Sequence, residues 1–311
     1  ARCITSLKNL VENMQLRKDP CGIFCVILIY ASLVYADYAL SRWMILPTFT
    51  EGLWAPVHII IFNIVLLLVV ISHSRTMLAD PGIVPLNKYS DDKQRRPLPD
   101  YSDDESGSDN EIFLRPEEYV GEDWSVCTRC ESFRPPRAHH CRVCRRCIRR
   151  MDHHCPWVNN CVGEFNQKYF LQFLIYVGLC SGYAIIVIIH SWVNHSDNGE
   201  TGLHGPRGQS GHHIKVVHTI MLSIEALLFG MFVLAVSCDQ FSAIFNDETA
   251  IESVQRRNRR SPRRSSRTSK ISLLRGICGK GPIWSWFLPC IPSTSEREVI
   301  HFPSAPPHYD V

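Results

Sequence analysis

The sequence lacks a strong charge of either sign. Its 311 residues contain 33 lysines and arginines against 30 aspartates and glutamates, which gives a net charge of +3. A balance this close to neutrality is ordinary for a chain of this length and gives no support to nucleic-acid binding. Charged residues are scarcest in four long apolar stretches, and these stretches decide the fold class.

Each of the four apolar stretches reaches or approaches the roughly 20 residues needed to cross the hydrocarbon core of a membrane. Strongly polar segments separate them, which argues against buried helices of a soluble domain. The stretches are 22–40, 53–72, 169–193 and 214–238. We therefore expect an all-α membrane protein with four transmembrane helices. No cleavable signal peptide is expected, because the first stretch is long enough to span.

One loop, 194–213, has almost no basic residues, since Arg207 is its only lysine or arginine. The N-terminal arm, the segment between the second and third helices and the C-terminal tail are rich in both. Cytosolic loops are enriched in Lys and Arg, so both termini and the central segment are predicted to face the cytosol. In that reducing compartment cysteines persist as thiolates that can bind zinc.

These features divide the chain into six segments. They are a cytosolic arm (1–21), two transmembrane helices (22–73), a partly disordered cytosolic linker (74–126), a cysteine-rich domain (127–168), two further transmembrane helices (169–238) and a cytosolic tail (239–311). The linker is rich in Ser, Pro and acids over 87–111, a composition that does not fold alone. The tail has a basic run at 256–270, which is predicted to bind anionic membrane lipid and not nucleic acid, because it is short and has no aromatic residues.

The segment from residue 127 to 161 contains seven of the 14 cysteines and four histidines. A closed zinc site takes four ligands, so two sites would use eight of these eleven residues and leave three. The expected leftovers are His139, His153 and Cys155, the last two beside Asp152. A thiol, an imidazole and a carboxylate together have the composition of an activated nucleophile. Ligand counting alone leaves an equal alternative, in which Cys155 is a zinc ligand.

A family resemblance is carried by Asp152-His153-His154-Cys155-Pro156-Trp157 and Asn160-Cys161-Val162-Gly163. This run resembles the cysteine-rich domain of the DHHC protein S-acyltransferases, and the likeness is to their Golgi members. The resemblance implies transfer of a long acyl group from acyl-CoA, such as palmitoyl-CoA, to membrane-proximal cysteines of proteins that face the cytosol. It further implies that Cys155 is the nucleophile, His153 the base and Asp152 the residue that orients it.

The same resemblance implies two structural zinc ions with defined ligands. The first set is Cys127, Cys130, His140 and Cys147, and the second is Cys141, Cys144, His154 and Cys161.

A stripe of residues on the third apolar stretch could line an acyl-chain slot. Phe170, Phe173, Val177 and Cys180 recur at steps of three and four, which places them on one helix face. Ordinary helix packing also produces such stripes, but in the resembling family the corresponding positions, with Trp157, line the acyl cavity. Because Cys180 is small where the slot should end, chains of sixteen and eighteen carbons are expected to fit.

Two shorter family motifs are partly present. Asp80-Pro81-Gly82 matches a motif that ends the second helix. Thr249-Ala250-Ile251-Glu252 lacks the second threonine of the family's Thr-Thr-x-Glu, so we expect one supporting contact beneath the active site to be lost. The family's C-terminal asparagine is not evident over 272–279.

Basic residues of the cysteine-rich domain could meet the CoA phosphates: Arg134, Arg137, Arg142, Arg145, Arg146, Arg149 and Lys168. The apolar segment 271–291 is predicted to lie on the membrane surface or to pack against the zinc domain, and its Cys278 and Cys290 could be acylated. The ending Tyr309-Asp310-Val311 resembles peptides that bind PDZ domains.

Two other functions compete with acyl transfer. One is a membrane-anchored zinc-binding interaction module without catalysis, which would have no use for Asp152, His153 and Cys155 together. The other is an ion transporter, suggested by His190 and Glu225 within apolar stretches. For location, the family likeness favours the Golgi, with the plasma membrane and endoplasmic reticulum as alternatives.

Overall fold

The structure is a computed structural model of the chain, and it describes residues 19–50, 52–86, 125–197, 206–258 and 268–289. Several predicted features lie outside these residues. They are most of the N-terminal arm, the acidic linker 87–111, most of the basic run 256–270, Cys290 and the C-terminal Tyr309-Asp310-Val311.

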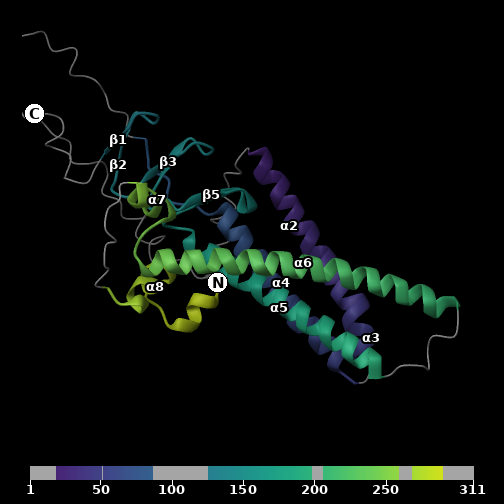
Figure 1. Cartoon of the computed structure of the whole chain (residues 1–311). Helices are drawn as coiled ribbons and strands as arrows, with labels where there is room; N and C mark the ends of the chain where they lie inside the picture. The colour runs from purple at the N-terminus through teal and green to yellow at the C-terminus, as the bar shows by residue number, and fades with distance from the viewer. Residues whose placement is uncertain (1–18, 51, 87–124, 198–205, 259–267, 290–311) are drawn as a thin grey trace, which may run out of the picture.

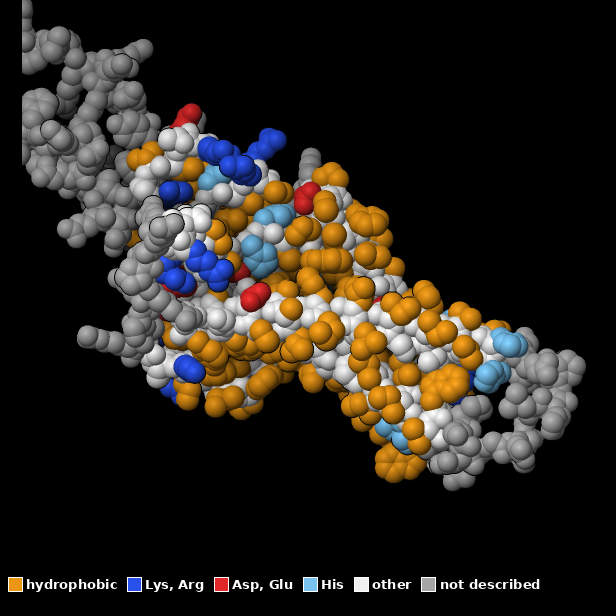
Figure 2. Space-filling model, in the orientation of Figure 1, with side chains coloured by type: hydrophobic (Ala, Val, Ile, Leu, Met, Phe, Trp, Pro, Cys, Tyr) orange, Lys and Arg blue, Asp and Glu red, His pale blue; other side chains and the backbone are white. Residues whose placement is uncertain are grey.

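Within the described residues, four long apolar helices form the membrane part (Figure 1). They are α2 (Pro20–Ala39), α4 (Trp54–Leu78), α5 (Gln167–Asp197) and α6 (Pro206–Phe245). α2 continues through a π-helical stretch, η1 (Leu40–Ile45), and the short α3 (Leu46–Thr48). Figure 2 shows that outward side chains along the helices are largely hydrophobic. All four helices are long and apolar enough to cross a membrane, which confirms a multi-pass membrane protein.

Two of the helices, α4 and α6, extend well past the limits predicted from hydropathy. α4 continues from the predicted end at residue 72 to Leu78, and its added turn is polar but buried: His73 and Thr76 are 0% exposed and Arg75 is 1% exposed. Arg75 donates to the Tyr169 hydroxyl at 2.7 Å and lies 4.3 Å from the centre of that ring. A hydropathy window averages the polarity of the side chains and takes no account of tertiary contacts. Polar residues that are buried by such contacts therefore made the predicted helix too short.

The cysteine-rich domain consists of three β-hairpins at one end of the helices (Figure 1). β1 (Ser125–Cys127) pairs with β2 (Ser132–Arg134), β3 (His139–Cys141) with β4 (Arg146–Ile148), and β5 (His153–Cys155) with β6 (Asn160–Val162). The prediction of an all-α protein omitted these strands. Their turns carry left-handed residues that are not glycine, such as Arg145 (φ 53°) and Asn159 (φ 46°). The turn signal that glycine usually supplies is therefore missing.

Two asparagines attach the zinc domain to the end of α4. The last carbonyl groups of a helix have no partner within it. The Asn160 side chain donates to the carbonyls of Thr76, Met77 and Ala79 at 3.2, 3.1 and 2.9 Å. Asn166 donates to the Thr76 carbonyl at 3.2 Å and to that of Cys161 at 2.7 Å. These bonds place the hairpin that carries Cys155 directly against the membrane part.

The motif Asp80-Pro81-Gly82 follows α4 and packs against the end of the second hairpin. Asp80 Oδ1 accepts from the backbone N–H of Gly82 and of Ile83, both at 2.8 Å. Gly82 has φ +101°, a conformation that other residues rarely adopt, and its carbonyl accepts from Arg149 N at 2.8 Å. The predicted turn is present, and it also adds backbone hydrogen bonds beside β4.

The C-terminal part of the described chain packs against α5 and the zinc domain. It contains α7 (Ala250–Asn258), α8 (Lys270–Cys278) and the 3-10 helix η4 (Ile283–Phe287). Lys168, Gln172 and Tyr176, each one turn apart on α5, donate to the carbonyls of Ser285, Trp286 and Phe287 in order. This segment is therefore fixed to the start of a membrane helix, while Trp284 stays 64% exposed.

Candidate metal centres and active site

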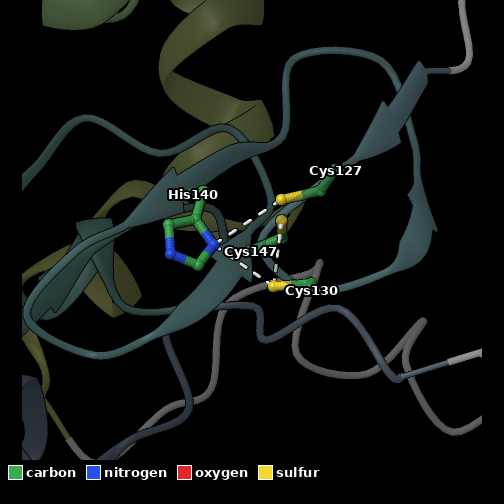
Figure 3. A group of neighbouring side chains, drawn as sticks. All are labelled: Cys127, Cys130, His140 and Cys147. Atoms are coloured by element: carbon green, nitrogen blue, oxygen red, sulfur yellow. Dashed lines mark hydrogen bonds between the residues drawn. The ribbon is translucent and has the colours of Figure 1, made fainter.

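The first group of metal-binding side chains joins the first two hairpins (Figure 3). Its members are Cys127, Cys130, His140 and Cys147, the first set that the sequence resemblance implies. His140 Nδ1 lies 3.6 Å from Cys127 Sγ and 3.2 Å from Cys130 Sγ, and the sulfurs of Cys130 and Cys147 are 3.8 Å apart.

The second group joins the second and third hairpins, and its members are Cys141, Cys144, His154 and Cys161. His154 Nδ1 lies 3.8, 3.5 and 3.6 Å from the sulfurs of Cys141, Cys144 and Cys161. These four residues are the second implied set. The other ring nitrogen of His154 lies 3.5 Å from a carboxylate oxygen of Asp19, the kind of outer partner that orients a metal-bound histidine.

Both groups fit zinc by donor chemistry and by spacing. Three thiolates and one imidazole are a common structural zinc set, and tetrahedral Zn–S and Zn–N bonds separate the ligand atoms by about 3.5–3.8 Å. In each group all the ligand atoms lie within 4.8 Å of one another. Each group has four protein ligands, so neither leaves a position open for water, and the arrangement suits a structural ion.

Strand alternation explains how neighbouring residues serve different sites. Successive side chains of a β-strand point to opposite faces. In β3, His140 therefore joins the first group while Cys141 joins the second. In β5 the same alternation gives His154 to the second group and leaves His153 and Cys155 on the other face. His139 also belongs to neither group, so the three expected leftovers are the three residues that remain.

The residues left over in β5 lie beside Asp152. Asp152 Oδ2 accepts from His153 Nδ1 at 2.7 Å, and the Cys155 thiol lies on the same strand face as His153. Burial lowers the pKa of His153, but its interactions with Asp152 and Cys155 outweigh burial and raise the pKa to about 9. An imidazole with that pKa is protonated at neutral pH and can stabilise a neighbouring thiolate.

Asp152 is only 2% exposed and accepts hydrogen bonds from three donors. Besides His153, these are Gln240 Nε2 on Oδ2 and the backbone N–H of Ala250 on Oδ1, both at 2.7 Å. At Ala250, where the family motif has its second threonine, the main chain thus supports Asp152. Any residue except proline could supply this donor.

The Thr-Ala-Ile-Glu run that carries Ala250 is a capping box at the start of α7. Thr249 Oγ1 accepts from Glu252 N at 3.3 Å, and Glu252 Oε2 accepts from Thr249 N at 2.8 Å, as the motif requires. The Glu252 carboxylate also receives two bonds from Arg137, at 2.6 and 2.8 Å. The first and last residues of the motif thus fix the helix start, and with it the Ala250 N–H.

Cys155 lies at a long apolar cavity of about 250 Å³ that runs between the helices. The five residues expected to line an acyl slot all line this cavity: Trp157, Phe170, Phe173, Val177 and Cys180. Its wall on α5 continues one turn beyond Cys180 to Ala184, so the slot does not end where the sequence suggested. From Phe170 to Ala184 the helix rises about 21 Å, which is of the order of an extended sixteen-carbon chain.

Comparison with known proteins settles the family. Residues 121–257 match the family model of the DHHC palmitoyltransferases. The chain is 35% identical over 250 residues to Palmitoyltransferase ZDHHC3 of Rattus norvegicus, an alignment that covers 80% of this chain and 76% of that protein. The chain belongs to the DHHC palmitoyltransferase family. This membership confirms the predicted reaction class, an acyltransferase that uses acyl-CoA as the donor.

Further relatives support the same family. Palmitoyltransferase ZDHHC7 of Mus musculus is 34% identical over 257 residues, which are 80% of this chain and 73% of that protein. Probable protein S-acyltransferase 12 of Arabidopsis thaliana is 34% identical over 179 residues, 55% of this chain and 57% of that protein. Similarity to the DHHC palmitoyltransferases therefore reaches well beyond the zinc domain into the membrane helices.

In this DHHC palmitoyltransferase some of the basic residues predicted to meet CoA have internal partners. Lys168 is 1% exposed and donates to the Ser285 carbonyl at 3.3 Å, so it is not available at the surface. Arg137 pairs with Glu252, and Arg149 donates to Glu164 at 2.7 Å. Arg142 and Arg145 are exposed on the hairpins, and they remain suitable for a phosphate.

The polar residues that suggested ion transport have packing partners. Glu225 lines the apolar cavity and hydrogen bonds the Ser32 side chain. The His190 ring stacks on Phe49, with 5.0 Å between the centroids. Because the chain is a DHHC palmitoyltransferase, the transport hypothesis loses its support.

Two residues that support the site were missed by sequence reasoning. Gln240 donates to Asp152, and His73 contacts both the Trp157 carbonyl at 3.0 Å and the Tyr30 hydroxyl at 3.1 Å. Both lie one or two residues past the predicted helix ends at 238 and 72. The sequence did contain a usable signal. A polar side chain at the cytosolic end of an apolar helix can face the zinc domain, and both residues stand at such ends.

Proposed function

We propose that the protein is an S-acyltransferase whose Cys155 carries the acyl group as a thioester between acyl-CoA and the cysteine of a protein substrate. The observation that carries the proposal is that Cys155 stands outside both metal-binding groups and lines the apolar cavity together with His153. A purely structural zinc module needs neither a spare thiol nor a slot.

In the first step the Cys155 thiolate attacks the thioester carbonyl of acyl-CoA. The bond from the acyl carbon to the CoA sulfur breaks, and His153 gives its proton to the departing thiolate, so CoA leaves as a thiol. Asp152 remains ionised and holds the ring through Nδ1. Burial raises the pKa of Asp152, but bonds from His153, Ala250 and Gln240 outweigh burial and lower it.

In the second step neutral His153 takes the proton of the substrate thiol, and the substrate sulfur attacks the acyl-Cys155 carbonyl. Cys155 leaves as a thiolate beside the protonated imidazole, which restores the starting state. Both steps exchange one thioester for another, so the chain contributes mainly positioning and charge stabilisation.

We further propose that the cavity accepts acyl chains of sixteen and eighteen carbons. The stripe Phe170, Phe173, Val177 and Cys180, together with Trp157, forms an apolar wall that leads away from Cys155. Burial of an apolar chain contributes about 0.8 kcal/mol of binding free energy per CH₂. The affinity of such a slot therefore depends strongly on the length of the acyl chain.

The eight Cys and His residues of the two groups are proposed as ligands of two structural zinc ions. Zinc bound there would hold the three hairpins together, since the second hairpin contributes to both groups. The chain's own backbone then keeps His153 and Cys155 in register on β5.

For location and partners, we propose a Golgi membrane protein with both termini and the zinc domain in the cytosol. The positive-inside rule supports the orientation, and Figure 2 shows Lys and Arg side chains gathered around the zinc-domain end. Likeness to Golgi members of the family supports the compartment.

Substrates are then membrane-proximal cysteines of proteins that face the cytosol, and the basic tail contacts anionic lipid. A PDZ-domain partner at the C-terminus rests on sequence alone.

A single-turnover transfer experiment tests the proposal. The purified full chain in detergent micelles is loaded with labelled palmitoyl-CoA, freed of excess donor, and mixed with a membrane-anchored peptide that ends in a cytosolic cysteine. We expect label to pass from the protein to the peptide without added donor. A peptide in which serine replaces the cysteine is the matched control. Label that stays on the protein until it hydrolyses would contradict acyl transfer.

A further inference from the structure

The N-terminal turns of α2 place two cysteines next to the active site. Cys21 and Cys25 are one helical turn apart on α2. Cys25 lies on the same helix as Ile29 and Ser32, which line the cavity that Cys155 also lines, although 130 residues separate Cys25 from Cys155 in sequence. The proposed mechanism uses neither Cys21 nor Cys25.

The start of α2 is fixed against the DHHC segment by two close contacts. Asp19, the N-cap residue of α2, places a carboxylate oxygen 3.5 Å from His154 Nε2. Gly22 packs so tightly that a Cβ there would lie 2.3 Å from Asn159 Oδ1. These contacts of Asp19 and Gly22, the residues that flank Cys21 and Pro20, fix the position of the helix relative to Cys155.

The helical repeat then decides where Cys25 points. Residues at steps of three and four share a face, so Gly22, Cys25, Ile29 and Ser32 form one stripe. Gly22 meets Asn159, whereas Ile29 and Ser32 line the cavity that Cys155 also lines. Cys25 lies between these contacts, and is therefore on the face of α2 that looks toward the acyl-bearing sulfur. Its side chain is only partly buried.

We propose that Cys25 is an internal acyl acceptor, which receives the acyl group from Cys155 by thioester exchange. The proposal rests on the function proposed above and adds a second modification site to it. In the step, the Cys25 sulfur forms a bond to the acyl carbon and the bond from that carbon to Cys155 breaks. The thiol proton of Cys25 passes to His153, and Cys155 is released as the paired thiolate, so no further reactant is needed.

Chemically, Cys25 has the properties that the enzyme's protein substrates must have. It is a thiol at the end of an apolar helix, beside the zinc domain, and its acyl chain would lie along the membrane part of α2. Thioester exchange between two cysteines is close to isoenergetic, so proximity decides the rate. An acceptor that belongs to the same chain is always present at high effective concentration.

A pulse and chase with the full chain tests the proposal. Protein loaded with labelled palmitoyl-CoA is freed of donor, digested at successive times, and the labelled peptides are identified by mass spectrometry after acid quenching. We expect label to appear first on Cys155 and then on Cys25, with one signal falling as the other rises. In Cys25→Ser the label per chain should fall from about two to about one after prolonged donor exposure, because only one thioester site remains.

Cys238→Ser is the matched control, since Cys238 is an exposed cysteine on another membrane helix and does not line the cavity. It should label as the unchanged chain does. Label confined to Cys155 at all times, or found on Cys21 in place of Cys25, would overturn this inference alone. Label on Cys25 in Cys155→Ser would also overturn it, because the acyl group would then come directly from acyl-CoA. No label on Cys155 in the unchanged chain would overturn the proposed function as well.

Discussion

At the scale of single residues, the hydrogen bonds to Asp152 determine the charge state of the proposed active site. One buried carboxylate accepts from His153, from Gln240 and from the Ala250 backbone, all at 2.7 Å. Hydrogen bonds to an ionised group favour its charged form, so the three donors keep Asp152 negative in a site where burial opposes charge. The negative charge in turn favours the protonated form of His153.

The backbone donor at Ala250 can be removed without changing the side chains around it. Ala250 is the first residue of α7, a position where proline is tolerated. In Ala250→Pro the bond to Asp152 is lost, and a hydrogen bond to a charged group is worth about 1.5–3 kcal/mol. We expect the rate of Cys155 acylation to fall by about 10- to 100-fold in single-turnover assays. Ala250→Ser keeps the N–H and should match the unchanged chain; equal rates for serine and proline would refute the role.

The two groups of metal-binding residues could be predicted from the sequence, but the hydrogen bonds around Asp152 could not. Counting ligands leaves His139, His153 and Cys155, and the structure leaves these same three outside both groups. The backbone contact at Ala250 was unpredictable, because a motif compares side chains and the donor here is the main chain.

At the scale of elements, the zinc domain is three hairpins joined by two metal-binding groups. β3 and β4 contribute His140 and Cys147 directly opposite each other, and β5 and β6 do the same with His154 and Cys161. Each group thus combines a cross-strand pair with a Cys-x-x-Cys turn from the preceding hairpin. Hairpins of three-residue strands are marginal alone, so metal binding and folding are expected to be coupled.

Metal content distinguishes ligands from the spare histidine. Cys130→Ser removes a ligand of the first group only, so we expect the zinc content of the purified chain to fall from about two ions to about one. His139→Ala changes a residue outside both groups and should keep both ions. Elemental analysis of the purified variants measures this. Zinc loss in His139→Ala, or none in Cys130→Ser, would be inconsistent with the assigned sets.

The α5 stripe gives a second element-scale prediction. Cys180 lines the cavity about 15 Å of helix beyond Phe170, and the wall continues to Ala184. A phenylalanine at position 180 would fill the slot short of its end. In competition assays Cys180→Phe is therefore expected to favour acyl-CoA of fourteen or fewer carbons over palmitoyl-CoA, whereas Cys180→Ser should keep the original preference. An unchanged length preference in Cys180→Phe would show that the chain lies elsewhere.

Helices and hairpins differ in how far the sequence predicted them. The four membrane helices follow from long apolar runs, although α4 and α6 extend to Leu78 and Phe245 because polar residues at their ends are satisfied by the zinc domain. The hairpins have three-residue strands and turns without glycine, so neither alternation nor turn residues mark them.

At the scale of the whole molecule, the zinc domain and the membrane helices form one connected unit (Figure 1). Asn160 and Asn166 bind the end of α4, Arg75 on α4 binds Tyr169 on α5, and Gln240 at the end of α6 binds Asp152. Each contact is buried and polar. Removing one of the two groups would leave the other buried without a hydrogen bond, which costs free energy. The arrangement keeps Cys155 at the junction between the zinc domain and the apolar cavity.

The sequence predicted this junction only in outline. Its motif placed Cys155 some ten residues before an apolar run that begins near Phe165, and hence near the membrane. The tertiary contacts that fix the distance involve Arg75, Asn166 and Gln240. No pattern in a single sequence pairs residues so far apart.

The most direct test of the account is to label the purified full chain with palmitoyl-CoA, treat it with hydroxylamine, and compare it with Cys155→Ser while measuring zinc in both. We predict a hydroxylamine-labile label on the unchanged chain, no label on Cys155→Ser, and about two zinc ions in each. Label that persists in Cys155→Ser, or loss of a zinc ion from it, would contradict the assignment of Cys155 as the nucleophile outside the metal sites.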